Sequence, residues 1–197
     1  AIVDPLAPPH LIRIDIDPEE MERLVPHAGI IADSAEGTRA LTKAIKGYKP
    51  RSTALADIAH SKSWANEKVQ EVKPHVDYLK VIREALPRDG FFVEEINQIG
   101  FTSTFAFPVY EPRTYVTCGF QGNLGFGFQA ALGVKAGNLD KVVISVTGDG
   151  GFMFGVQELA TAAQEQLGLI TIVMNNSAFG NVRRDMRRIY KRQPLGS

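Results

Sequence analysis

The chain of 197 residues lacks the features that mark several specialised protein classes. It has one cysteine, Cys118, which excludes an internal disulfide framework and is typical of a reducing compartment. No apolar run approaches the roughly 20 residues that a helix needs to cross a bilayer, and no secretory leader pattern opens the chain. The first residue is not Met, which suggests a segment of a longer protein. We therefore expect a cytoplasmic protein with no membrane partner.

An excess of charge of either sign is also absent, because 22 Lys and Arg balance 22 Asp and Glu. The balance is uneven along the chain. Residues 183–197 hold six basic residues against Asp185, which leaves 16 basic and 21 acidic residues elsewhere. A mildly acidic body argues against nucleic acid as a partner, because a phosphate backbone requires a broad basic face.

Alternating strand and helix patterns predict an α/β protein with a doubly wound, mostly parallel sheet and helices on both faces. Strands are expected at 11–17, 29–34, 91–95, 115–119, 141–147 and 169–175, and helices at 19–25, 35–47, 75–87, 126–137 and 152–166. Residues 96–113 carry two prolines and are expected to be irregular. Residues 48–74 are predicted to be a linker with some helix near Trp64, between a short unit at 1–47 and a second unit at 75–197.

Oxygen-bearing side chains follow the two most apolar predicted strands. Asp149 comes just after strand 141–147, and Asn176 just after strand 169–175. Because parallel strands joined by one crossover end at the same sheet edge, both side chains can meet at one ion. Carboxylate, amide and backbone carbonyl oxygens suit Mg²⁺ or Ca²⁺. The adjacent glycines lead into a helix whose free amide groups suit a phosphate, so the pattern predicts a phosphorylated cofactor bound through Mg²⁺.

The segment 148–176, GDGGFMFGVQELATAAQEQLGLITIVMNN, resembles the diphosphate-binding signature of thiamine-diphosphate enzymes. The resemblance implies that Asp149, Asn176 and the backbone carbonyl of Ala178 bind Mg²⁺, with further oxygens from the diphosphate and a water molecule. The cofactor-binding residues that it implies are Gly122, Asn123, Leu124, Gly148, Asp149, Gly150, Gly151, Asn176, Ala178 and Phe179.

A second stretch, GFQGNLGFGFQAALG at 119–133, resembles the glycine-rich turn that holds the aminopyrimidine in acetolactate-synthase-like members. By that resemblance the Gly122 carbonyl accepts from the cofactor's amino group, and Leu124 is the apolar wedge under the bent cofactor. Relatives often carry Met or Ile at the wedge, and Pro where this chain has Gln129.

A third stretch, 12–34, is similar to the end of the family's central domain, so 1–47 is expected to be the tail of that domain. FAD binding by a longer parent is left open and is not carried over. The family's activating glutamate lies in a pyrimidine-binding domain, which this chain does not contain. We therefore expect no catalytic residue here, an inactive chain, and an incomplete C-terminal end to the diphosphate-binding domain.

The resemblance implies an intact enzyme that cleaves or forms C–C bonds next to the carbonyl of a 2-oxo acid, as an acetolactate-synthase-like transferase or lyase. Its partners would be a pyrimidine-binding domain of the same or another subunit, within a homodimer or homotetramer. The alternatives are a 2-oxo-acid decarboxylase or lyase, a binding module without activity, and a dinucleotide-binding dehydrogenase. The last rests on a weak G-x-G-x-x-G/A match at Gly125, Gly127 and Ala130.

Several residues keep two interpretations. Cys118 is most simply a small buried residue. The four histidines lack metal-ligand spacing and are expected on the surface or in the linker. Glu94 and Glu95 either line the cofactor cleft or lie in a solvated loop. Arg183, Arg184, Arg187 and Arg188 either are solvated on an amphipathic helix or border the active site and attract an anionic substrate.

Overall fold

The computed structural model describes residues 10–23, 25–49 and 54–196. The chain divides between Ile58 and Ala59 into two compact units. None of the helices in these described ranges is both long and apolar enough to cross a membrane.

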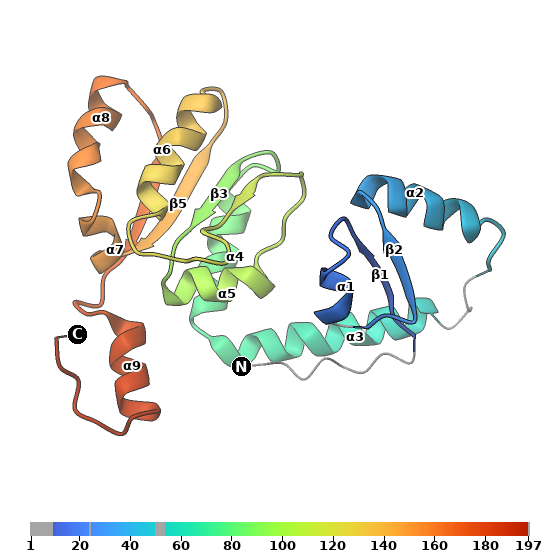
Figure 1. Ribbon diagram of the computed structural model, residues 1–197. Helices are drawn as coiled ribbons and strands as arrows, with labels where there is room; N and C mark the ends of the chain where they lie inside the picture. Colours follow the sequence, from blue (N-terminus) through green and yellow to red (C-terminus); the bar gives the residue numbers. More distant parts are fainter. Residues whose placement is uncertain (1–9, 24, 50–53, 197) are drawn as a thin grey trace. The chain divides into compact units, whose positions relative to one another are not determined.

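The first unit is a small parallel pair of strands with two helices (Figure 1). Its elements are β1 (Ile12–Asp15), α1 (Glu20–Arg23), β2 (Ala28–Ile31) and α2 (Ser34–Ala44). Asp33 caps α2 by accepting a 2.9 Å hydrogen bond from the Ala35 amide. Gly37 is buried because α2 packs there against Ile14 of β1 and Ile30 of β2.

The stretch 48–74, predicted to be a linker with some helix near Trp64, does contain that helix and is more helical than expected. It forms α3 (Ala54–Val69), followed by a single 3₁₀ turn, η1 (Gln70–Val72). Its apolar side chains are largely exposed, Trp64 among them. Ala, Lys and Glu, which favour helices, recur in this stretch, and the linker prediction gave them too little weight.

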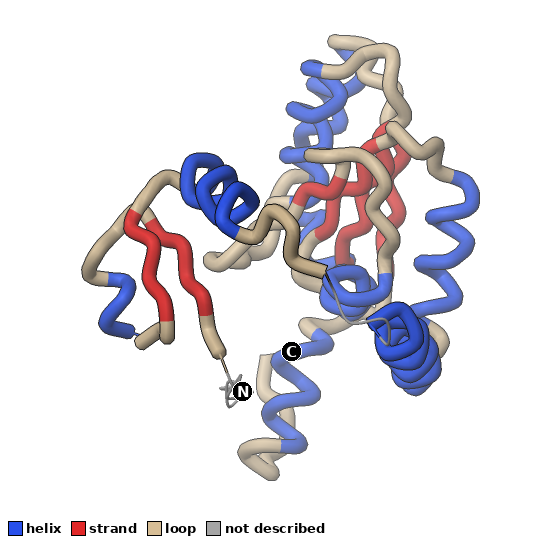
Figure 2. Tube along the Cα trace, turned by 90° about the vertical axis from the view of Figure 1, so that its right-hand side faces the viewer, coloured by secondary structure: helices blue, strands red, loops and turns tan. Residues whose placement is uncertain are grey.

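The second unit is built on a four-stranded, fully parallel sheet in the order β4-β3-β5-β6. The strands are β3 (Phe91–Glu94), β4 (Tyr115–Val116), β5 (Val143–Gly148) and β6 (Ile170–Met174). The predicted α/β architecture is confirmed, with helices on both faces of the sheet (Figure 2). Apolar runs such as VISV in β5 are buried throughout, as expected for a parallel strand covered on both sides.

The alternation of side chains along each strand assigns them to two cores. Phe92 and Ile144 pack with α4 (His75–Ala85) and α5 (Gln98–Ala106) on one face. Val93 and Val143 pack with α6 (Gly127–Gly137) on the other. Burying a large apolar side chain of this kind contributes roughly 1.5–3 kcal/mol.

Two expectations about helices were wrong. Residues 96–113 are not irregular throughout, because α5 begins directly after Asn97, whose side chain caps it. The predicted helix at 152–166 is instead three pieces, α7 (Asp149–Met153), the 3₁₀ turn η2 (Val156–Glu158) and α8 (Leu159–Gln164). The chain bends at Gly155, which lies outside the helical region of backbone conformation. The last helix is α9 (Gly180–Arg188).

Candidate functional site

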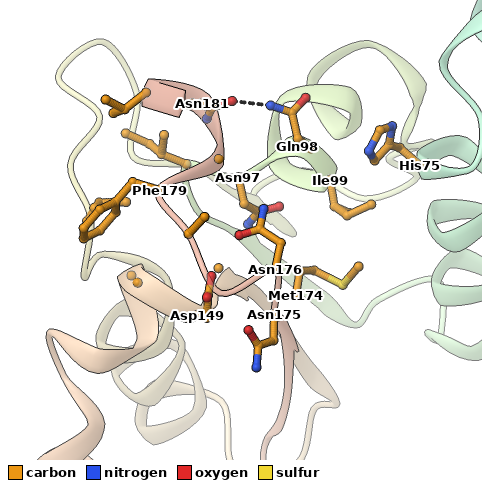
Figure 3. A pocket seen from close by; sticks show the side chains of 18 of the residues that line it. His75, Asn97, Gln98, Ile99, Asp149, Met174, Asn175, Asn176, Phe179 and Asn181 are labelled. Carbon is orange, nitrogen blue, oxygen red and sulfur yellow. Dashed lines mark hydrogen bonds between the residues drawn. The ribbon is translucent and has the colours of Figure 1, made fainter. Parts of the chain in front are cut away.

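A hollow of about 350 Å³ opens at the carboxyl edge of the four-stranded sheet, beside the ends of β5 and β6 (Figure 3). Eight of the ten residues predicted to bind the cofactor line it: Leu124, Gly148, Asp149, Gly150, Gly151, Asn176, Ala178 and Phe179. Gly122 and Asn123 do not line it and are exposed on the preceding turn. The sheet edge therefore gathers segments that are far apart in the sequence.

Strand register explains why Asp149 and Asn176 lie at one edge. Gly148, the last residue of β5, pairs with Met174, the last residue of β6, so both strands end together. Asn175 is committed to its own turn, because its side-chain oxygen accepts a 2.9 Å hydrogen bond from the Ser177 amide. In Figure 3 the Asn176 side chain projects away from that of Asn175 and toward Asn97. Asn176 is thus the residue of the pair whose amide faces the other hollow-lining side chains.

Residues 148–151, where β5 ends and the first turn of α7 begins, are called here the turn at 148–151 and are closely packed. A Cβ atom at Gly150 would lie 2.7 Å from the Phe179 ring, so only glycine lets that ring approach the turn. Within the described part of the chain, no three His, Cys, Asp or Glu side chains converge as a metal site. A cation at this edge would therefore take its charged protein ligand from Asp149 and neutral oxygens from Asn176 and backbone carbonyls. Such a hard-oxygen set fits Mg²⁺ held jointly with a diphosphate.

The glycine-rich turn reaches the hollow through Leu124. Gly125 has a positive φ of 88°, which allows the chain to turn sharply from Leu124 into α6. Gly122 packs closely on Ile96, where a Cβ atom would lie 3.0 Å from Cγ1. The turn is therefore fitted against the segment that follows β3.

Neither interpretation of Glu94 and Glu95 was right, because both side chains are buried and neither lines the hollow. Glu94 accepts a hydrogen bond from the Thr117 hydroxyl. Burial raises the pKa of Glu94, and the nearby Glu95 adds to the rise. Glu95 instead contacts the Gly125 amide and the Thr147 hydroxyl. The two neighbouring carboxylates thus accept hydrogen bonds from different segments of the chain.

Sequence reasoning missed Asn97, which organises this edge of the sheet. Its side-chain amide donates 3.2 Å hydrogen bonds to the backbone oxygens of Glu95 and Val146, and its oxygen accepts from the Gly100 amide at 2.9 Å. An Asn directly before an apolar helix is a capping signal that could have revealed it.

Further lining residues come from elements on either side. Gln98 donates a hydrogen bond to Asn181 of α9, which joins the start of α5 to the start of α9 (Figure 3). His75, expected on the surface or in the linker, lines the hollow from α4. Its position follows from the packing of α4 against α5, which the sequence does not reveal.

A second hollow of about 360 Å³ adjoins the first and is basic. Both are lined by Asn176, Ala178 and Gly180, and the second adds Arg183, Arg184, Arg187 and Arg188 of α9. Asp185 does not line this hollow, and its carboxylate pairs with Arg184 at 2.9 Å. The electrostatic potential here favours an anion.

Cys118 lines neither hollow and lies beside the glycine-rich turn, where a Cβ atom at Gly122 would be 3.2 Å from its Sγ. Burial raises the pKa of its thiol, and the Glu94 carboxyl raises it further. The neutral thiol therefore predominates near pH 7, and a nucleophilic role is disfavoured.

Comparison with known proteins agrees with this geometry. Residues 97–196 match the model of the thiamine pyrophosphate enzyme C-terminal TPP-binding domain. The chain is 32% identical over 182 residues to a probable 2-ketoarginine decarboxylase of Pseudomonas aeruginosa, covering 89% of this chain and 32% of the relative. It is 29% identical over 185 residues to the large subunit of acetolactate synthase isozyme 1 of Escherichia coli K12, covering 92% and 33%.

A glyoxylate carboligase of Escherichia coli O157:H7 is 30% identical over 188 residues, covering 90% of this chain and 32% of the relative. The chain thus spans about a third of the length of these curated relatives. The family match covers just over half of the chain and includes the turn at 148–151, β6 and α9. The chain belongs to the thiamine pyrophosphate enzyme family and carries its C-terminal cofactor-binding domain.

Proposed function

We propose that the hollow at the ends of β5 and β6 binds thiamine diphosphate (thiamine pyrophosphate) together with Mg²⁺. The observation that carries the proposal is that Asp149, Asn176 and the glycine turn at 148–151 line one hollow at the carboxyl edge of a parallel sheet. Thiamine diphosphate supplies, when bound, an electron sink for cleavage or formation of C–C bonds next to a carbonyl.

Different residues of the chain would bind the metal, the diphosphate and the apolar part of the cofactor. Asp149 provides the charged ligand for Mg²⁺, and Asn176 and the Ala178 carbonyl provide neutral ones. The backbone amides of Gly150 and Gly151, at the start of α7, would donate to the diphosphate. Leu124 packs under the cofactor and excludes water beside it.

The reaction that we propose for the assembled enzyme is acetolactate-synthase-like chemistry on a 2-oxo acid. Decarboxylation alone is the alternative, and the probable 2-ketoarginine decarboxylase among the relatives favours keeping it. The activating glutamate would come from a pyrimidine-binding domain of the same or a partner subunit, in a homodimer or homotetramer. This chain alone would bind the cofactor without turning over substrate.

The basic hollow supports an anionic substrate. Arg187 and Arg188 are exposed on α9, and the hollow that they line shares Asn176 and Gly180 with the cofactor site. A 2-oxo acid carries a carboxylate, and the guanidinium groups would raise its local concentration beside the cofactor.

A direct titration tests the cofactor class. Thiamine diphosphate with Mg²⁺ is titrated into the 197-residue chain by calorimetry, and NAD is titrated in parallel. We expect saturable binding of the former and none of the latter. Binding of NAD without binding of thiamine diphosphate would favour the dehydrogenase alternative and refute the proposal.

A further inference from the structure

Glu95 is a carboxylate whose burial is energetically unfavourable. Its residue is fully buried, with a relative exposure of 0%, and no described Lys, Arg or His forms an ion pair with it. Burying an unpaired charge or an unsatisfied carboxyl group destabilises a fold unless hydrogen bonds compensate. Its hydrogen-bond donors therefore indicate what the residue does.

Those donors come from two different segments. One carboxyl oxygen of Glu95 accepts from the backbone amide of Gly125, at the end of the glycine-rich turn. The other accepts from the hydroxyl of Thr147, directly before the turn at 148–151. A single side chain thus links the two turns that the cofactor site requires.

Two glycines make room for this link. A Cβ atom at Gly127, the first residue of α6, would lie 2.9 Å from Cβ of Glu95. A Cβ atom at Gly151 in α7 would lie 2.6 Å from Cδ of Glu95. The carboxyl group is therefore enclosed between the first turns of both helices, where any larger side chain would displace it.

The residues next in sequence to the two hydrogen-bond donors of Glu95 line the hollow. Leu124 precedes Gly125, and Gly148 follows Thr147. We propose that Glu95 is a positioning residue, which holds the glycine-rich turn and the turn at 148–151 at the separation that thiamine diphosphate spans. This inference rests on the proposed function.

Two ligands distinguish positioning from general structural support. Inorganic pyrophosphate with Mg²⁺ would use the turn at 148–151 and the proposed Mg²⁺ ligands, whereas thiamine diphosphate with Mg²⁺ would also contact the glycine-rich turn. Calorimetry on the 197-residue chain gives a dissociation constant for each ligand. The ratio of the two constants reports how well the turns are held relative to each other.

Four variants complete the experiment. Glu95→Gln places an amide against one of the two donors, and Thr147→Val removes one donor at constant shape. We expect each to weaken thiamine diphosphate binding about 10-fold while pyrophosphate binding changes less than about 2-fold. Thr147→Ser keeps the hydroxyl and should retain the wild-type ratio. Glu94→Gln changes the neighbouring buried carboxylate, which bonds to Thr117 instead, and should also retain it.

Different results of these titrations would overturn the inference or the proposed function. Equal weakening of both ligands in Glu95→Gln and Thr147→Val would show a purely structural role and overturn the inference, as would an unchanged ratio. If Glu95→Gln does not fold, Thr147→Val decides, with Thr147→Ser as its control. Failure of the wild-type chain to bind either ligand would refute the proposed function itself, and this inference with it.

Discussion

At the scale of single residues, the charge on Asp149 should dominate cofactor binding. Asp149→Ala removes the charged Mg²⁺ ligand, and we expect the dissociation constant of thiamine diphosphate to rise by about 100-fold or more. Asn176→Ala removes a neutral ligand, and a rise of about 10-fold is expected. Calorimetry at fixed Mg²⁺ measures both values, with Gln164→Ala as a control because that side chain is exposed on α8 and lines neither hollow. Unchanged affinity in both variants would contradict the assignment.

Glu94 should make stability depend on pH. Burial raises its pKa in the folded chain, so the folded state binds this proton more tightly than the unfolded state does. The stabilisation is complete below the unfolded pKa, near 4.5, and is lost as pH rises through the higher folded pKa. Wild-type unfolding temperature should therefore fall relative to Glu94→Gln as pH rises above about 4.5. A difference between the two proteins that stays constant over that range would contradict the prediction.

At the scale of elements, the glycine-rich turn should matter more for reaction than for anchoring. Leu124 lines the hollow and makes no ionic contribution. In the enzyme assembled with its pyrimidine-binding domain, Leu124→Ala should lower kcat about 10-fold or more, while the dissociation constant changes by less than about 3-fold. A steady-state assay combined with a cofactor titration measures both. A normal kcat would show that the turn does not shape the cofactor.

Elements with a clear hydrophobic pattern could be predicted from the sequence. β5 and β6 are short, apolar and followed by polar residues, so their parallel pairing and the meeting of Asp149 with Asn176 at one edge follow from pattern and topology. α5 was missed because apolar and polar residues alternate in it without a helical period. The role of Glu95 could not be predicted, since it depends on three-dimensional contacts with Gly125 and Thr147.

At the scale of the whole molecule, the second unit has apolar surface suited to association. β6 pairs only with β5 among the described strands and exposes Ile170 by 53%. Phe105 and Phe154 are each 60% exposed. Open strand edges and apolar side chains of this kind favour association. Sedimentation velocity should show the average mass rising with concentration, and a monomer at all concentrations would contradict this.

The most direct test of the cofactor site replaces Mg²⁺ with paramagnetic Mn²⁺. Amide NMR signals of the 197-residue chain are recorded with Mn²⁺ alone and then with thiamine diphosphate added. If the metal and diphosphate bind together where proposed, adding the cofactor should broaden the signals of residues 148–151 and 176–179 selectively, and Asp149→Ala should abolish the effect. Broadening that is centred elsewhere, or that does not depend on the cofactor, would contradict the proposed site.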